Sequence, residues 1–154
     1  MFMFKKVFKL HYGFTHIELF ITMIILVLLI LIAYPLYQHA ILKVRRAEAR
    51  VALHSVMLQQ ERFYTQHNTY SAFTSNTNNS IFKWWSGDSI EKSYYEISAT
   101  PCPSKQLTQC VLLTATSGTK NVKQVDDSIC GDLMLDSANN KTYSKSTEPN
   151  AECW

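Results

Sequence analysis

The stretch Gly13-Phe14-Thr15-His16-Ile17-Glu18 stands directly before nineteen residues, Leu19–Tyr37, that include no Asp, Glu, Lys or Arg. At a helical rise of about 1.5 Å per residue, this run would measure about 28 Å, close to the thickness of a bilayer's hydrocarbon core. A carboxylate inside such a segment costs roughly 2.5–3.5 kcal/mol at full depth and usually persists only for function. The sequence therefore predicts a membrane-spanning helix in which Glu18 needs a partner.

The same stretch resembles the GFTxxE processing signature of type IV pilins and their relatives. It follows a short leader, Met1–Gly13, that has three lysines and no acid, and Tyr34-Pro35-Leu36-Tyr37-Gln38 follows the apolar run in that family's style. The resemblance covers about the first seventy residues. It implies that a prepilin peptidase cuts between Gly13 and Phe14 and N-methylates the new Phe14 amine. It also implies that Glu18 registers an incoming subunit against its predecessor.

The proposed cleavage is chemically reasonable without the resemblance. A secretory signal peptide loses its apolar region, whereas a cut after Gly13 leaves the apolar helix attached. The cut also creates a positive amine at Phe14, one helical turn from Glu18, so that a carboxylate–ammonium pair becomes available. An uncleaved single-span anchor is the alternative interpretation of this segment.

Charge gives a weaker indication of orientation than the resemblance does. The leader's Lys5, Lys6 and Lys9 favour a cytoplasmic N-terminus, but Lys43, Arg45, Arg46 and Arg50 flank the other end of the apolar run. The resemblance implies a bacterial inner-membrane protein with a single span and a periplasmic head, which later enters an extracellular fibre. The implied partners are prepilin peptidase, the inner-membrane assembly machinery, other major and minor pilins, and membrane lipid before assembly.

The apolar run continues into Gln38–Gln66 without a loop signal, among strong helix formers. We expect one helix from about Phe14 to about His67, kinked or loosened at Pro35. This divides the chain into a leader (1–13), a membrane or filament-core half of the helix (14–37), an amphipathic half (38–67) and a β head (68–154). The expected class is α+β, with the type IV pilin fold implied by the resemblance.

The head is predicted to form a small antiparallel sheet, because short alternating segments are separated by turn residues. The expected strands are Tyr94–Thr100, Cys110–Thr116, Val122–Val125 and Leu133–Asp136, with a possible return near Thr142–Ser144. Ser71–Ser80 is rich in Ser, Thr and Asn and is predicted to be a surface loop.

All four cysteines, Cys102, Cys110, Cys130 and Cys153, fall in the C-terminal half. An even number in a domain outside the inner membrane indicates disulfides in an oxidising compartment, and three pairings are possible. We favour Cys102–Cys110, which closes a short Pro-flanked loop, and Cys130–Cys153, which ties down the chain end. The resemblance supports the second pair more than the first. No C-x-x-C pair or Cys/His spacing supports a zinc site.

Two further segments have a functional and a structural interpretation. Lys83, Trp84 and Trp85 could contact DNA, since aromatic and cationic side chains together bind nucleic acid. Adjacent tryptophans more often pack a loop on the core or contact other subunits, and from Val51 onward acids outnumber bases. The acids around Gly131 do not fit an EF-hand calcium loop, so a solvated acidic connection is expected there: Asp126, Asp127, Asp132 and Asp136.

Within this family, the sequence resembles minor pilins of the PilE type. That resemblance rests on Arg45-Arg46-Ala47-Glu48-Ala49, on Gln60-Glu61-Arg62-Phe63-Tyr64 with Thr69-Tyr70, on Cys130-Gly131 and on Cys153-Trp154. It implies a minor subunit that enters or primes a type IV pilus and serves motility, adhesion or DNA uptake. A type II secretion pseudopilin and a DNA-receptor pilin are the alternatives. No catalytic constellation emerges, so neither an enzyme nor a cofactor or metal site is expected.

Overall fold

The computed structural model describes residues 15–77, 81–124, 127–145 and 153–154, and its longest element is helix α1, His16–His67. Thr15 caps the helix: its hydroxyl accepts the Glu18 amide at 3.3 Å and its carbonyl accepts the Leu19 amide at 3.2 Å. Asn68 ends it in the left-handed region (φ 55°), where Asn is one of the favoured residues. The predicted C-terminal end of the helix is confirmed, while the predicted start at Phe14 lies outside the described residues.

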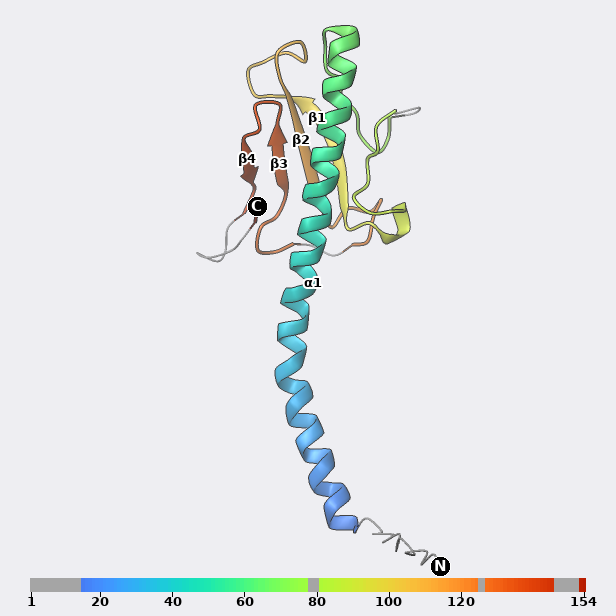
Figure 1. Cartoon of the computed structure of the whole chain (residues 1–154), viewed down its shortest axis with the longest axis vertical. Helices are drawn as coiled ribbons and strands as arrows, with labels where there is room; N and C mark the ends of the chain where they lie inside the picture. The colour runs from blue at the N-terminus through green and yellow to red at the C-terminus, as the bar shows by residue number, and fades with distance from the viewer. Residues whose placement is uncertain (1–14, 78–80, 125–126, 146–152) are drawn as a thin grey trace, which may run out of the picture. The chain divides into compact units, whose positions relative to one another are not determined.

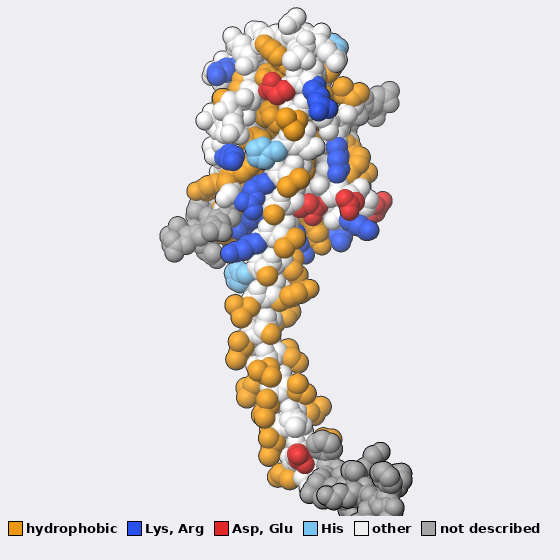
Figure 2. All heavy atoms as spheres, viewed as in Figure 1, with side chains coloured by type: hydrophobic (Ala, Val, Ile, Leu, Met, Phe, Trp, Pro, Cys, Tyr) orange, Lys and Arg blue, Asp and Glu red, His pale blue; other side chains and the backbone are white. Residues whose placement is uncertain are grey.

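The first part of α1, Leu19–Tyr37, has no charged side chain on any side of the helix. The helix remains continuous through Pro35, and the kink there stays a prediction. By length and composition, α1 is the one helix in the described part of the chain that could cross a membrane. Figure 2 shows hydrophobic side chains along this part of the helix, and each of its large apolar residues is more than half exposed. Such a surface requires an apolar environment.

Internal contacts separate the chain up to Ala40 from a second unit, Ile41–Trp154. This second unit contains the rest of α1 and a four-stranded antiparallel sheet in the order β1-β2-β3-β4 (Figure 1). The strands are β1 (Tyr95–Pro101), β2 (Val111–Ser117), β3 (Leu133–Asp136) and β4 (Lys141–Tyr143). All four match predicted strands, with ends that shift by one residue at most.

The predicted strand Val122–Val125 is wrong over the residues that are described, Val122–Gln124. Val122 is buried, but the Lys123 amide donates to the Ser93 carbonyl at 2.9 Å, outside the sheet. Val122 is therefore an apolar residue that a loop buries without pairing it in the sheet.

The connection from α1 to β1 follows the free edge of β1. Isolated bridges join Phe73 to Ala99 and Trp85 to Glu96, and a short 3₁₀ turn, η1 (Ile90–Lys92), precedes the strand. The connection thereby covers much of an edge that would otherwise present unpaired backbone groups.

One face of α1 forms the core together with one face of the sheet. Arg46, Ala49, Leu53, Val56 and Gln60 recur every three or four residues and are all buried. They meet alternate residues of the first three strands, which are buried in the same way: Tyr95, Ile97, Ala99, Val111, Leu113, Ala115, Leu133 and Leu135.

Gln60 is a polar member of this core, and both its side-chain oxygen and its side-chain nitrogen form hydrogen bonds. Its side-chain amide donates to the Ser71 carbonyl at 2.7 Å and accepts the Ser71 amide at 2.9 Å. It therefore fixes the chain that leaves α1 against the helix's own buried face.

Candidate functional site

The residues expected to act in processing and assembly lie at the N-terminus. Gly13 and Phe14 lie outside the described residues. Glu18 lies in the first turn of α1 and is exposed. An acid in the first turn is favoured by the helix dipole, and an exposed carboxylate can be reached by a second molecule.

The centre of the head is a buried ion pair between α1 and the loop before β3. Arg46 Nε donates to Asp127 Oδ2 at 2.6 Å and Nη2 donates to Oδ1 at 2.8 Å, a two-pronged geometry. Arg46 is 4% exposed and Asp127 is 1% exposed. Both charges are therefore almost completely removed from water.

The Asp127 carboxylate also accepts hydrogen bonds from neutral donors in two other parts of the head. The Tyr95 hydroxyl donates to Oδ2 at 2.9 Å, and the amides of Ile129 and Cys130 donate to Oδ1 at 3.2 and 3.1 Å. The Asp127 amide in turn donates to the Ser117 hydroxyl at 3.0 Å. One residue thus joins α1, β1, β2 and the Cys130 turn.

The electrostatics of this cluster follow from burial and pairing. The hydrogen bond to Asp127 raises the pKa of Arg46 despite burial. Burial alone would raise the pKa of Asp127, but hydrogen bonds from Arg46, the Cys130 amide and Tyr95 outweigh it and leave that pKa below its usual value. Burial and the Asp127 charge raise the pKa of Tyr95 well above its usual value. The ion pair and a neutral Tyr95 are the stable state.

The expectation of solvated acids around Gly131 is wrong for Asp127. Asp136 has a different role, because its Oδ1 accepts the amides of Ala138 and Asn140 and so closes the β3–β4 turn. Among the described residues no group of three His, Cys, Asp or Glu could hold a metal ion. Burial of Asp127 carries no local signal, since its partner stands 81 positions earlier in the chain.

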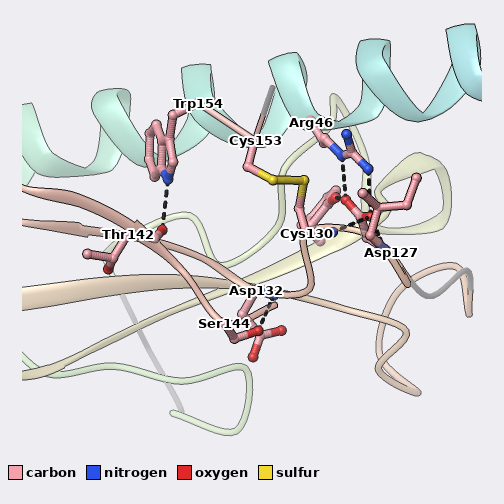
Figure 3. Close-up of a disulfide and its surroundings, with 10 residues drawn as sticks. Arg46, Asp127, Cys130, Asp132, Thr142, Ser144, Cys153 and Trp154 are labelled. Carbon is pink, nitrogen blue, oxygen red and sulfur yellow. Dashed lines mark hydrogen bonds and ion pairs between the residues drawn. A yellow bond between two sulfur atoms is a disulfide. The ribbon is translucent and has the colours of Figure 1, made fainter. Parts of the chain in front are cut away.

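Two disulfides staple the head, with the pairing favoured from the sequence. Cys102–Cys110 closes the β1–β2 loop, and Cys130–Cys153 joins the turn after Asp127 to the C-terminal segment. Figure 3 shows the second bond beside the Arg46–Asp127 pair. Next to it, the Trp154 indole donates to the Thr142 carbonyl at 2.7 Å and packs edge-on against His54.

Lys83, Trp84 and Trp85 lie together at the β1 edge. Trp84 packs partly on the core and its carbonyl accepts the Ile97 amide at 2.7 Å. Trp85 stands edge-to-face with Trp84, with ring centroids 5.4 Å apart, and Lys83 Nζ lies 5.6 Å from the Trp85 centroid. Trp84 thus follows the structural interpretation, while Lys83 and Trp85 remain half-exposed beside each other.

A second cation–aromatic cluster was not predicted. Arg45 Cζ lies 3.8 Å above the Tyr94 ring, and Lys123 Nζ lies 4.9 Å from the same ring centroid. Lys123 also donates to the Tyr94 hydroxyl at 3.4 Å, and this bond, together with the two positive charges, lowers the pKa of Tyr94. The dipeptide Arg45-Arg46 was the available signal, but its two members contact different partners.

The chain is similar to known pilins in sequence and in structure. The family model "Type IV minor pilin ComP, DNA uptake sequence receptor" matches residues 35–134. A type IV pilin from Shewanella oneidensis is similar in structure, with 25% identity, a TM-score of 0.41, and coverage of 71% of this chain and 93% of that chain. The Neisseria meningitidis non-core minor pilin PilV is similar at 20% identity and a TM-score of 0.47, with coverage of 71% and 92%. No curated protein sequence matches.

Proposed function

The chain belongs to the ComP family of type IV minor pilins, and from this we propose that it is a fibre subunit that binds DNA for uptake. The family match carries the proposal, because it covers residues 35–134 and so includes the whole connection in which Lys83, Trp84 and Trp85 lie. A family of pilus subunits also favours a pilus over a type II secretion system as the place of action. The subunit acts by packing and binding, not by catalysis.

The DNA contact that we propose is Lys83 with Trp84 and Trp85. Lys83 supplies a charge for phosphate, and the half-exposed Trp85 ring offers a flat apolar surface beside it. The head has no excess of positive charge from Val51 onward, so the attraction to DNA has to be local.

Titration of a short fluorescent duplex with the full chain in detergent micelles tests this contact. We expect Lys83→Gln to weaken binding for all duplexes and to reduce the salt slope by about one phosphate contact. Trp85→Ala should weaken binding further, whereas Lys105→Gln, on the exposed β1–β2 loop, should leave affinity unchanged. Equal affinities for all four proteins, with unchanged thermal stability, would refute the contact.

We further propose the processing and assembly route that the N-terminal stretch implies. Prepilin peptidase removes residues 1–13 and N-methylates Phe14, and the helix stays in the inner membrane with the head in the periplasm. The assembly machinery then exchanges lipid around α1 for neighbouring pilin helices. The apolar surface of α1 over Leu19–Tyr37 supports this exchange, because that surface would stay buried in both environments.

Glu18 gains its partner in this route. The new Phe14 amine of the same or a neighbouring subunit is the nearest positive charge that cleavage creates, and the exposed carboxylate is free to meet it.

Intact-mass and N-terminal analysis of protein from bacterial membranes and from sheared surface fibres tests the route. A chain that starts at N-methylated Phe14 and is present in fibres is the expected result. The same trimmed chain confined to membranes would contradict incorporation, and a chain that still starts at Met1 would contradict processing.

A further inference from the structure

The Arg45–Tyr94–Lys123 cluster is not used by the function proposed above. Both cations converge on one aromatic ring, and within the described residues the only ion pair is Arg46–Asp127, so neither charge is neutralised there. Arg45 is half-buried and Lys123 is exposed. Stacking on Tyr94 orders the guanidinium while its edge keeps donors for an anion.

Only a short stretch of chain separates Arg45 of this cluster from the apolar run Leu19–Tyr37. Arg45 follows Tyr37, the last residue of the run, by eight positions. These residues are helical in α1, and at about 1.5 Å per residue they span about 12 Å. Even a fully extended chain of this length would reach at most about 29 Å. Arg45 therefore stays within reach of whatever interface the end of the run occupies.

The end of the run has the composition of a membrane interface. Tyr34 and Tyr37 are both 64% exposed there, and tyrosines are enriched where hydrocarbon meets headgroups. The headgroup layer extends several ångströms beyond the roughly 30 Å hydrocarbon core. Arg45, about two helical turns further along α1, is therefore close enough to reach the phosphates, and the Tyr94 ring links it to Lys123.

We propose that Arg45 and Lys123 bind the phosphate oxygens of anionic phospholipid headgroups, with Tyr94 as the platform that holds the two cations together. This inference rests on the proposed membrane insertion of α1, because insertion is what brings the lipid to the cluster. The contact holds the head against the bilayer before assembly and is released when the subunit leaves the lipid. Lipid is favoured over DNA because the cluster is tethered to the apolar run, whereas Lys83 and Trp85 lie at the β1 edge.

Native mass spectrometry of the full chain, released from nanodiscs of mixed phosphatidylglycerol and phosphatidylcholine, tests this inference. The wild-type chain should retain phosphatidylglycerol in preference to phosphatidylcholine. Each of Arg45→Gln and Lys123→Gln should reduce the preference about fivefold at low salt, the effect of one interfacial charge. Lys105→Gln is the matched control and should keep the wild-type preference, while Arg46 and its buried pair remain intact in all variants.

The outcomes separate the inference from its premise. A chain that fails to insert into the nanodisc would contradict the proposed membrane route itself. A chain that inserts, but whose preference is absent or is unchanged in the Arg45→Gln, Lys123→Gln double variant, would overturn the lipid site alone. If the double variant keeps its lipid preference and loses affinity for the short duplex, the cluster is a DNA contact and the inference is wrong.

Discussion

At the scale of single residues, Asp127 has the largest structural influence in the head. It accepts two hydrogen bonds from Arg46 and further ones from Tyr95, Ile129 and Cys130, so both carboxylate oxygens are used. A buried charge with this many partners costs little while all are present and much when one is removed. Its contribution therefore lies in fixing how the helix, the sheet and the Cys130 turn meet.

Asp127→Asn should lower the free energy of unfolding by about 3–5 kcal/mol, because Arg46 would remain charged and buried without its counter-ion. Adding Arg46→Met to the same chain should restore most of the loss, since the Asn oxygen can still accept the Ile129 and Cys130 amides while its NH2 group donates to the Tyr95 hydroxyl. Urea unfolding of the full chain in micelles, followed by tryptophan fluorescence, measures both. A single variant as stable as the wild type would show that the pair does not hold the head together.

The pH dependence of stability should follow from the same residues. The pKa of folded Asp127 lies below its usual value, so its contribution is complete above about pH 3.9 and is lost as pH falls through the lower, folded-state pKa. The pKa of Tyr95 is raised, so its contribution is lost as pH rises above about 10. Melting curves across pH should show that the stability of the wild type, relative to the Arg46→Met, Asp127→Asn double variant, falls at acid pH. A stability difference that stays constant across pH would contradict this linkage.

Contacts between side chains that are far apart in the sequence were the hardest feature to predict. Of the three possible cysteine pairings, loop length and the position of the chain end favoured the one that the structure has. Asp127 looked like one of several surface acids, since nothing near it in the sequence indicates the arginine on α1. Only the fold brings these two together.

At the scale of elements, the helix and the strands follow directly from sequence periodicity. The buried face of α1 recurs every three or four residues, and each of the first three strands of the sheet alternates buried and half-buried positions. The segment Val122–Gln124 shows the limit of predicting strands from periodicity, since it was predicted as a strand and is a loop. A short apolar segment can be buried by a loop as well as by a sheet, and periodicity over three or four residues does not separate the two.

The two disulfides should contribute unequally to stability. Their sequence separations are 8 and 23, and a chain-entropy account gives roughly 2.5 kcal/mol for Cys102–Cys110 and roughly 3.5 kcal/mol for Cys130–Cys153. The second bond also holds the segment that places Trp154 on Thr142. Paired Cys→Ala variants, unfolded in urea, should therefore rank the second bond as the larger loss. The reverse ranking would contradict this account.

At the scale of the whole molecule, the chain combines an exposed apolar segment of α1, which requires lipid or other helices around it, with a head that buries its own core. In the route proposed above, Glu18 is the residue that connects this architecture to assembly. We expect Glu18→Ala to be trimmed at Gly13 to the same extent as the wild type but to be strongly depleted from surface fibres, because the amine that cleavage creates at Phe14 would lack its carboxylate partner.

Glu18→Gln is the matched variant for this prediction, since it keeps the size of the side chain and removes only the charge. Immunoblots of membranes and sheared fibres measure both variants against the wild type. Normal incorporation of trimmed Glu18→Gln would show that the charge is not required.

The long separation between Arg46 and Asp127 also has a consequence for the order of events during synthesis. Arg46 is made 81 residues before its partner, which at about 5–20 residues per second is a delay of roughly 4–16 s. During that interval the buried face of α1 has neither its ion pair nor a complete sheet to cover Ala49, Leu53 and Val56. The apolar face of α1 therefore stays uncovered in the nascent head until almost the whole chain has been made. The protein is most exposed to aggregation and to proteases during this interval.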